Sequence, residues 1–338
     1  MLPDNFKELI RAESEKLGFC VCGFTGAEPP EDFARYLQWL ESDPVGTMGY
    51  LKREDTLAKR ADPRILLPEA QSICVLGVQM GIYPPADNPE VASYAHYVDY
   101  HEAILPMAEA LVERIQTYLP AIKFDKGFRI KDQEISKPDF HPPTTDHQPQ
   151  TTALRYRICI DSAPILERSL AVQAGLGWIG KSSMFINPKY GSGLFLCEIL
   201  LNLPLEPDRP YTEDRCGRCR RCIDACPNHC IDPQTRTIRA DHCASYLTIE
   251  HKGEFTPEQI ELVGTHLFGC DECLRACPWN SGNTGSSPLQ KAPHIPCISD
   301  YDLTDPEFKE KFRNSPVLRT KAKGLRRNIE AVRKNSDQ

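Results

Sequence analysis

The sequence contains no apolar run long enough to cross a membrane. A spanning helix needs about 20 consecutive apolar residues, and no stretch of this 338-residue chain approaches that length. The N-terminal segment MLPDNFKELIRAESEKLGF also lacks the apolar core of an export signal. We therefore expect a cytoplasmic protein with no membrane partner.

The sequence also lacks an internal repeat with a period of about 20 to 50 residues, which argues against a solenoid. Its length allows two domains. Residues 1–205 predict an α/β unit. The apolar patterns predict buried strands over 70–80, 155–161 and 193–203, and helices near the N-terminus, over 99–119 and from 163.

Two segments depart from this regular pattern. Pro106 is a candidate break in the helix over 99–119. Residues 125–151 are polar and rich in proline, which predicts a long surface loop.

Charge is spread unevenly along the chain. The formal net charge is -7, but residues 307–338 contain ten Lys/Arg and four Asp/Glu and carry +6, which leaves -13 for the rest. Both a solvated C-terminal helix and a segment that binds a polyanion have this composition.

The fifteen cysteines are the most informative feature of the sequence. Without an export signal they indicate metal or cofactor chemistry rather than disulfides. CGRCRRCIDACP and CDECLRACPWN match the spacing of bacterial two-cluster ferredoxins, in which the last cysteine of each run reaches the other cluster. The spacing predicts one 4Fe-4S cluster on Cys216, Cys219, Cys222 and Cys277, and a second on Cys226, Cys270 and Cys273.

Two cubane clusters need eight thiolates, so one ligand is missing from the two runs. Cys230 and Cys243 are the candidates in the same segment. Cys230 follows Cys226 by only four residues, which makes simultaneous ligation awkward, and we therefore expect Cys243. Zinc knuckles are the alternative, but two CxxC pairs would leave three cysteines of the runs unexplained. Core positions are expected for Cys20, Cys22, Cys74, Cys159, Cys197 and Cys297.

The stretch GLGWIGKS (175–182) matches the phosphate-binding loop of P-loop NTPases. That loop must connect a strand to a helix. Here the preceding residues have a helical pattern and the following MFINP resembles a strand. We therefore expect no nucleotide site, and only a point-charge role for Lys181.

Five segments in this order resemble the epoxyqueuosine reductase family, over about residues 5–330. They are DYHEAIL, DSAPILERSLAVQAGLGWIGKSSMFINPKYGSGLFLCEIL, CGRCRRCIDACP, CASYLTIEHKG and FGCDECLRACPWN. The resemblance implies reduction of epoxyqueuosine at the tRNA wobble position to queuosine. It implies base-off cobalamin and two 4Fe-4S clusters as cofactors, tRNA as partner, and an external one-electron donor.

The same resemblance implies an α+β fold. It would comprise a cobalamin-binding α/β catalytic domain over 1–205, similar to the nitroreductase-like domain of reductive dehalogenases, then a dicluster ferredoxin-like domain over 206–300 and a basic helical tail over 301–338. The cluster ligands agree with those above, including Cys243. The implied cobalamin contacts are Arg60, Asp161, Leu166, Phe185, Leu196, Ser245 and Tyr246.

Asp161 is the implied proton donor to the opening epoxide. Burial of a carboxyl group favours its protonated form, as this role requires. The alternative from the residues alone is an N-cap for the helix that begins near Pro164. In the DYH stretch, Asp99 is expected to cap the following helix, and His101 is a second candidate polar group near the substrate.

Two other functions fit part of the pattern. One is a reductive dehalogenase-like corrinoid enzyme, whose usual export signal is missing here. The other is a non-enzymatic dicluster electron carrier, which would bind neither a corrinoid nor a substrate.

Overall fold

The computed structural model of this protein describes residues 2, 5–42, 45–84, 89–119, 123–124, 153–283 and 287–337. The predicted surface loop over 125–151 lies outside these ranges. Within them, no helix has both the length and the apolar character that a bilayer crossing requires.

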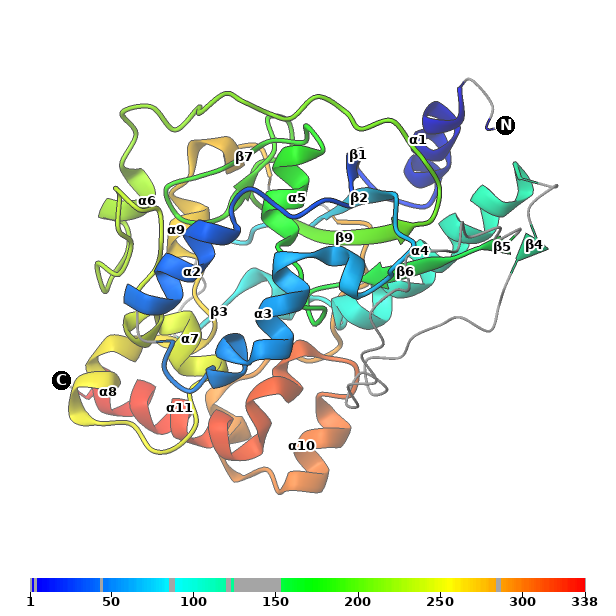
Figure 1. Cartoon of the computed structure of the whole chain (residues 1–338). Helices are drawn as coiled ribbons and strands as arrows, with labels where there is room; N and C mark the ends of the chain where they lie inside the picture. The colour runs from blue at the N-terminus through cyan, green and yellow to red at the C-terminus, as the bar shows by residue number, and fades with distance from the viewer. Residues whose placement is uncertain are drawn as a thin grey trace.

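A four-stranded sheet forms the centre of the N-terminal part (Figure 1). Its strands, in spatial order, are β1 (Val21–Gly26), β2 (Ser72–Gln79), β9 (Leu194–Leu201) and β6 (Tyr156–Cys159). Every neighbouring pair is antiparallel. The three predicted strands are confirmed, and the missed strand β1 has the glycine-containing sequence VCGFTG. Because every neighbouring pair of strands is antiparallel, this part is better described as α+β than as the α/β unit expected for residues 1–205.

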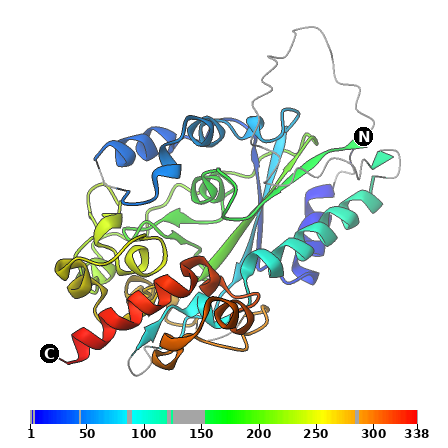
Figure 2. The same cartoon turned by 90° about the horizontal axis from the view of Figure 1, so that it is seen from below.

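Helices cover both faces of the sheet, which buries β2 along nearly its whole length. Helices α1 (Phe6–Lys16) and α4 (Tyr100–Thr117) lie on one side, and α5 (Glu167–Gln173) lies on the other (Figure 2). Side chains alternate accordingly: Leu76 packs in the cluster with α1 and α4, and Val75 packs in the cluster with α5. Helix α4 continues through Pro106, so the candidate break does not occur.

The cysteine-rich segment folds into short elements beside this sheet (Figure 1). They are α6 (Arg221–Asp224), α7 (Ala244–Ile249), α8 (Pro257–Val263), β10 (His266–Phe268) and α9 (Glu272–Arg275). Strand β10 pairs in parallel with β3 (Glu90–Val91). Strand β3 of the N-terminal part is therefore paired with a strand of the cluster-bearing part. The two parts share this small sheet.

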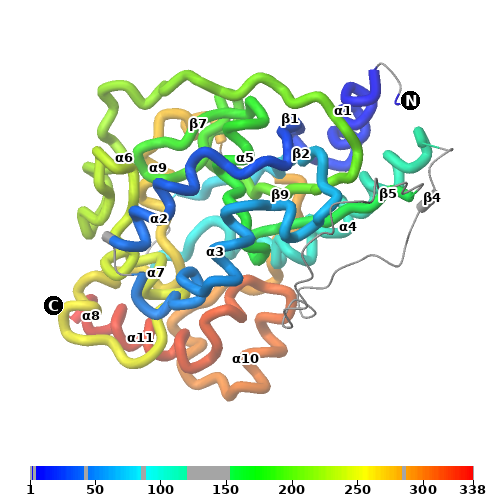
Figure 3. Tube along the Cα trace, in the orientation of Figure 1, coloured from blue at the N-terminus to red at the C-terminus, as the bar shows by residue number. Residues whose placement is uncertain are grey.

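The C-terminal helices pack onto the cluster-bearing part. Helix α10 (Asp305–Lys311) and helix α11 (Lys321–Ser336) share an apolar cluster with β10, in which Phe268, Phe312 and Ile329 are fully buried. Helices α1 and α11 lie on opposite sides of the molecule (Figure 3). The basic segment is thus held by its apolar face, and its charges project from a fixed helix.

The remaining elements are short. They are α2 (Phe33–Ser42), α3 (Glu54–Ala61), β4 (Lys123–Phe124), β5 (Ala153–Leu154), β7 (Trp178–Ile179) and β8 (Phe185–Ile186).

Candidate cluster centres and active site

The two cysteine runs fold alike. Each forms a four-residue helix, with Cys222 in α6 and Cys273 in α9, and these two helices pack against each other. Pro227 and Pro278 follow the last cysteine of each run. The two runs, which have similar spacing, thus form similar helical turns. Packing of α6 against α9 brings residues some 50 positions apart into contact.

Thiols of the two runs lie near one another and act on each other's pKa values. Burial raises the pKa of Cys277, and the nearby thiols of Cys216, Cys222 and Cys219 raise it further. The pKa of Cys273 is likewise raised by burial, then by the thiols of Cys270 and Cys243, and further by Cys222 of the first run. Thiols crowded in this way disfavour one another's charged forms. Binding to iron would relieve this repulsion, so the donor set fits thiolate-ligated clusters.

One further thiol, that of Cys230, lies beside Cys226 and Cys243, two of the four predicted ligands of the second cluster. The sulfur of Cys230 lies 3.4 Å from that of Cys226 and within hydrogen-bonding reach of the thiol of Cys243. Cys230 is 5% exposed. Sequence reasoning set Cys230 aside as a ligand but did not foresee that it would touch both neighbours.

Asp161 lies just beyond the end of β6, on a turn with left-handed backbone geometry (φ 50°). Its carboxylate Oδ2 accepts a 2.7 Å hydrogen bond from the hydroxyl of Tyr100 and lies 3.7 Å from Nε2 of His101. Asp161 does not cap α5, which begins at Glu167 without a side-chain cap, so the N-cap alternative is wrong. Its side chain is 61% exposed, so Asp161 is not the buried carboxyl group expected from the sequence.

The DYH stretch forms the other half of this site. Asp99 caps α4 as predicted, accepting a 3.0 Å hydrogen bond from the backbone N–H of His101. The same carboxylate oxygen lies 2.8 Å from Nδ1 of His101. Burial disfavours the charged imidazole, but Asp99 and then Asp161 outweigh it, so the pKa of His101 lies above its ordinary value. His101 therefore links two carboxylates and favours its protonated form.

Glu167 is a partner of Asp161 that sequence reasoning missed. Its Oε1 accepts a 2.7 Å hydrogen bond from the backbone N–H of Asp161 and so holds the left-handed turn. Burial, followed by the charge of Asp161, raises the pKa of Glu167 to about 7. The charge of Glu167 also acts on Glu198, whose carboxylate is buried in β9 without a hydrogen-bond partner among the described residues.

The positions predicted to contact cobalamin come from several elements. Leu166 precedes α5, Phe185 is buried in β8, and Leu196 packs against the apolar cluster beside α5. Arg60, in α3, has its guanidinium 5.4 Å from the ring centre of Tyr36 and a buried Nη1 without a hydrogen-bond partner in the described chain. A buried donor of this kind suits a polar ligand.

Two further predicted contacts lie on α7, where Ser245 is half-buried and Tyr246 is buried. The hydroxyl of Tyr246 accepts a 2.6 Å hydrogen bond from the backbone N–H of Thr47. Burial raises the pKa of the nearby Tyr50, with smaller effects from several charges, Asp161 and Arg60 among them.

The glycine-rich stretch 175–182 follows helix α5, contains strand β7 and leads into strand β8. The expected helix before the stretch and strand after it are confirmed, so it does not have the strand–loop–helix context of a P-loop. Lys181 donates hydrogen bonds of 2.7 Å and 3.0 Å to the carbonyls of Gly217 and Cys219. Through these two hydrogen bonds the ammonium group of Lys181 fixes the backbone of the first cysteine run.

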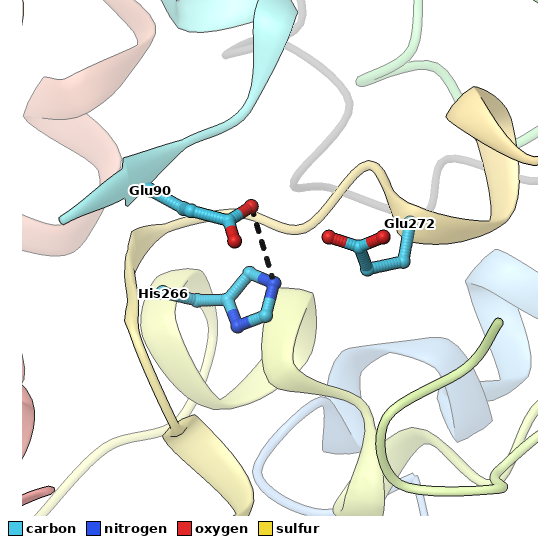
Figure 4. Close-up of side chains that lie close together, drawn as sticks. All are labelled: Glu90, His266 and Glu272. Carbon is cyan, nitrogen blue, oxygen red and sulfur yellow. Dashed lines mark ion pairs between the residues drawn. The ribbon is translucent and has the colours of Figure 1, made fainter. Parts of the chain in front are cut away.

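A separate polar group lies where β3 meets the cluster-bearing part (Figure 4). Ligand atoms of Glu90, His266 and Glu272 lie within 4.8 Å of one another. However, Nη2 of Arg275 donates to Glu90 at 2.6 Å and also to Glu272. A guanidinium already supplies the positive charge that a cation would bring, so we interpret this group as an ion-pair network that ties α9 to β3.

Comparisons with known proteins agree with this architecture. Residues 215–280 match the family model described as a 4Fe-4S double cluster binding domain, and residues 60–128 match the one described as epoxyqueuosine reductase QueG, DUF1730. An epoxyqueuosine reductase of Leadbetterella byssophila is 35% identical, covering 97% of this chain and 99% of the relative.

Solved structures of the same family resemble the fold. The Streptococcus thermophilus epoxyqueuosine reductase superposes with a TM-score of 0.79 at 24% identity, covering 99% of this chain and 82% of that one. An epoxyqueuosine reductase in complex with an epoxyqueuosine-modified tRNA-Tyr stem loop superposes with a TM-score of 0.75 at 25% identity, covering 98% and 81%. The family predicted from the motifs is confirmed: this chain belongs to the epoxyqueuosine reductases.

Proposed function

We propose that this chain reduces the epoxide of epoxyqueuosine in tRNA to the alkene of queuosine. The observation that carries the proposal is the pairing of Asp161 with Tyr100 and His101, in a chain that also contains a double-cluster domain. The reaction consumes two electrons and two protons, breaks both C–O bonds of the epoxide and releases water. The chain must therefore deliver electrons and protons to one place.

Electrons would enter through the cysteine-rich segment from an external one-electron donor. We propose Cys216, Cys219, Cys222 and Cys277 as ligands of one 4Fe-4S cluster, and Cys226, Cys243, Cys270 and Cys273 as ligands of the other. Both clusters, when bound, supply single electrons, which suits stepwise delivery. Contact between α6 and α9 keeps the two sets of thiols close together.

Base-off cobalamin would lie beside Asp161. We propose that Arg60, Leu166, Phe185, Leu196, Ser245 and Tyr246 contact it, together with Asp161. The unpartnered Nη1 of Arg60 and the apolar surroundings of Phe185 and Leu196 fit a large ligand that is partly polar and partly apolar. When bound, cobalamin supplies a low-valent cobalt centre for the reduction.

The protein's own part in the chemistry is proton delivery. We propose that Asp161 donates a proton to the epoxide oxygen as the C–O bond breaks. Tyr100 holds the carboxylate through its hydroxyl, and Nε2 of His101 lies 3.7 Å from the same oxygen. Asp99 and Asp161 raise the pKa of His101 despite its burial, and we propose that His101 is the group that returns a proton to Asp161.

The partner would be tRNA, in the cytoplasm, where its modification takes place. Exposed basic side chains on α10 and α11, including Lys309, Lys321 and Lys334, and Arg218, Arg220 and Arg221 in the first cysteine run suit phosphate contacts. Arg327 does not belong to this surface. It is 7% exposed and donates hydrogen bonds to the carbonyls of Leu247, His251 and Gly253.

Reconstitution tests the proposal directly. The protein, purified without oxygen and loaded with iron, sulfide and cobalamin, is incubated with a reductant and tRNA containing epoxyqueuosine, and nucleosides are identified by mass spectrometry. We expect queuosine to form and cobalamin to be retained. A protein that holds both clusters but neither retains cobalamin nor forms queuosine would instead be an electron carrier. Asp161→Asn, with the same iron content, should lose turnover by about 10²-fold or more.

A further inference from the structure

The cysteine-rich segment contains nine cysteines between residues 216 and 277, whereas two cubane clusters bind eight. The ninth, Cys230, is neither remote nor exposed. Its sulfur lies 3.4 Å from that of Cys226 and reaches the thiol of Cys243, the two residues proposed as ligands of the same cluster. If Cys226 and Cys243 bind iron and Cys230 does not, the thiol of Cys230 keeps its hydrogen and contacts two ligand sulfurs.

The backbone fixes Cys230 in this position. Its carbonyl accepts a 2.9 Å hydrogen bond from the N–H of Arg239, and the next residue, Ile231, bridges to Ile238. The side chain is enclosed in an apolar cluster with Ile223 and Ile231. A buried thiol held in this way has few alternatives to hydrogen bonding with the neighbouring sulfurs.

The proposed ligand Cys226 is already surrounded by donors. Backbone N–H groups of Asn228 and Cys230 reach its sulfur, in addition to the thiol of Cys230. Donors aimed at ligand sulfurs stabilise the more negative, reduced state of an iron–sulfur cluster and so raise its reduction potential. In a buried site a thiol donor to a charged thiolate is strengthened by the low dielectric.

We propose that Cys230 is a positioning residue that tunes the cluster on Cys226, Cys243, Cys270 and Cys273, donating its single S–H hydrogen bond to the sulfur of Cys226 or Cys243 without binding iron. This inference rests on the proposed ligand set. It assigns a function to Cys230, the cysteine of the segment that this set does not include. The cluster concerned would accept an electron more readily than it would with an inert side chain at position 230.

The test compares Cys230→Ala and Cys230→Ser with the unmodified chain, and uses Cys74→Ala as a matched control in which a buried thiol is lost from the sheet. Each protein is reconstituted, its iron and sulfide are counted, and both clusters are titrated by EPR at controlled potentials. We expect eight irons in every protein. In Cys230→Ala, one of the two midpoint potentials should fall by about 59 mV, a tenfold change in the ratio of reduced to oxidised cluster.

Cys230→Ser keeps a hydroxyl donor, so its potential should lie closer to that of the unmodified protein, and Cys74→Ala should leave both potentials in place. Unchanged potentials in Cys230→Ala would overturn the inference. So would a loss of about four irons, because Cys230 would then be a ligand. These readouts need no turnover, so failure of the proposed reaction on tRNA would be seen separately.

Discussion

The hydroxyl of Tyr100 lies 2.7 Å from Oδ2 of Asp161, although 61 residues separate the two in the chain. Tyr100 begins α4 on one face of the sheet, and Asp161 follows β6 in the same sheet. The ring of Tyr100 stacks on Phe195 of β9, with ring centres 4.5 Å apart, which fixes the direction of the hydroxyl. The acid proposed for catalysis is thus oriented by a side chain that the sheet itself holds in place.

Removal of that hydroxyl should impair catalysis while leaving the fold intact. Tyr100→Phe keeps the stacked ring but loses the hydrogen bond to Asp161. We expect turnover on epoxyqueuosine tRNA to fall about tenfold, the equivalent of about 1.4 kcal/mol, with the iron content unchanged. Tyr118→Phe, which loses a hydroxyl that contacts Glu13 instead, is the matched control and should keep its turnover.

The pH dependence of turnover should report on His101. Burial lowers the pKa of His101, but Asp99 more than compensates and raises it. In Asp99→Asn that compensation is lost, so the pKa should fall and the high-pH limb of the activity profile should move to lower pH. Rate measurements from pH 5 to 9 would reveal the shift. A limb that stays in place in the variant would show that His101 does not supply the proton.

The stability of the chain should depend on Glu167. Burial and the charge of Asp161 raise the pKa of Glu167 to about 7, above its ordinary value near 4.5. The folded state therefore binds more protons than the unfolded state between these pH values, and stability falls as pH rises through that window. Thermal melts of the unmodified chain and Glu167→Gln should differ in slope between pH 5 and 7, the variant being flatter. Parallel curves would contradict the assignment.

The iron content of variants should show whether Cys243 is a cluster ligand. Cys243→Ala should bind about four irons where the unmodified chain binds eight, because one cluster loses a ligand. Cys297→Ala, a cysteine outside the cysteine-rich segment, should bind all eight. Full iron content in Cys243→Ala would show that another residue provides the eighth ligand.

The network around Arg275 should contribute to stability. Arg275→Met removes the cation between Glu90 and Glu272 and leaves two partly buried carboxylates facing each other. We expect a loss of about 1–3 kcal/mol, the usual cost of a buried charged group without its partner, seen as a lower melting temperature. Added Zn²⁺ or Mg²⁺ should not stabilise the unmodified protein, whereas stabilisation by either would indicate a metal site.

The sequence alone determined whatever is local along the chain. The spacing of the two cysteine runs predicts a segment that binds two 4Fe-4S clusters, because each run carries its pattern within about a dozen residues. Apolar runs predict β2, β6 and β9 because continuous burial leaves a continuous pattern. The same local logic separates the stretch 175–182 from a P-loop, since a helix precedes it.

Only the tertiary structure decided which distant groups meet. The antiparallel order of the sheet follows from chain reversals that the apolar pattern does not encode, and β1 was missed because glycine and threonine weaken its pattern. The partners of Asp161 come from α4 and α5, on opposite faces of the sheet, so no spacing in the sequence predicts them. Cys230 reads as a spare thiol in the sequence. It contacts Cys226, four residues earlier, and it also reaches Cys243 because the chain folds back between residues 230 and 243.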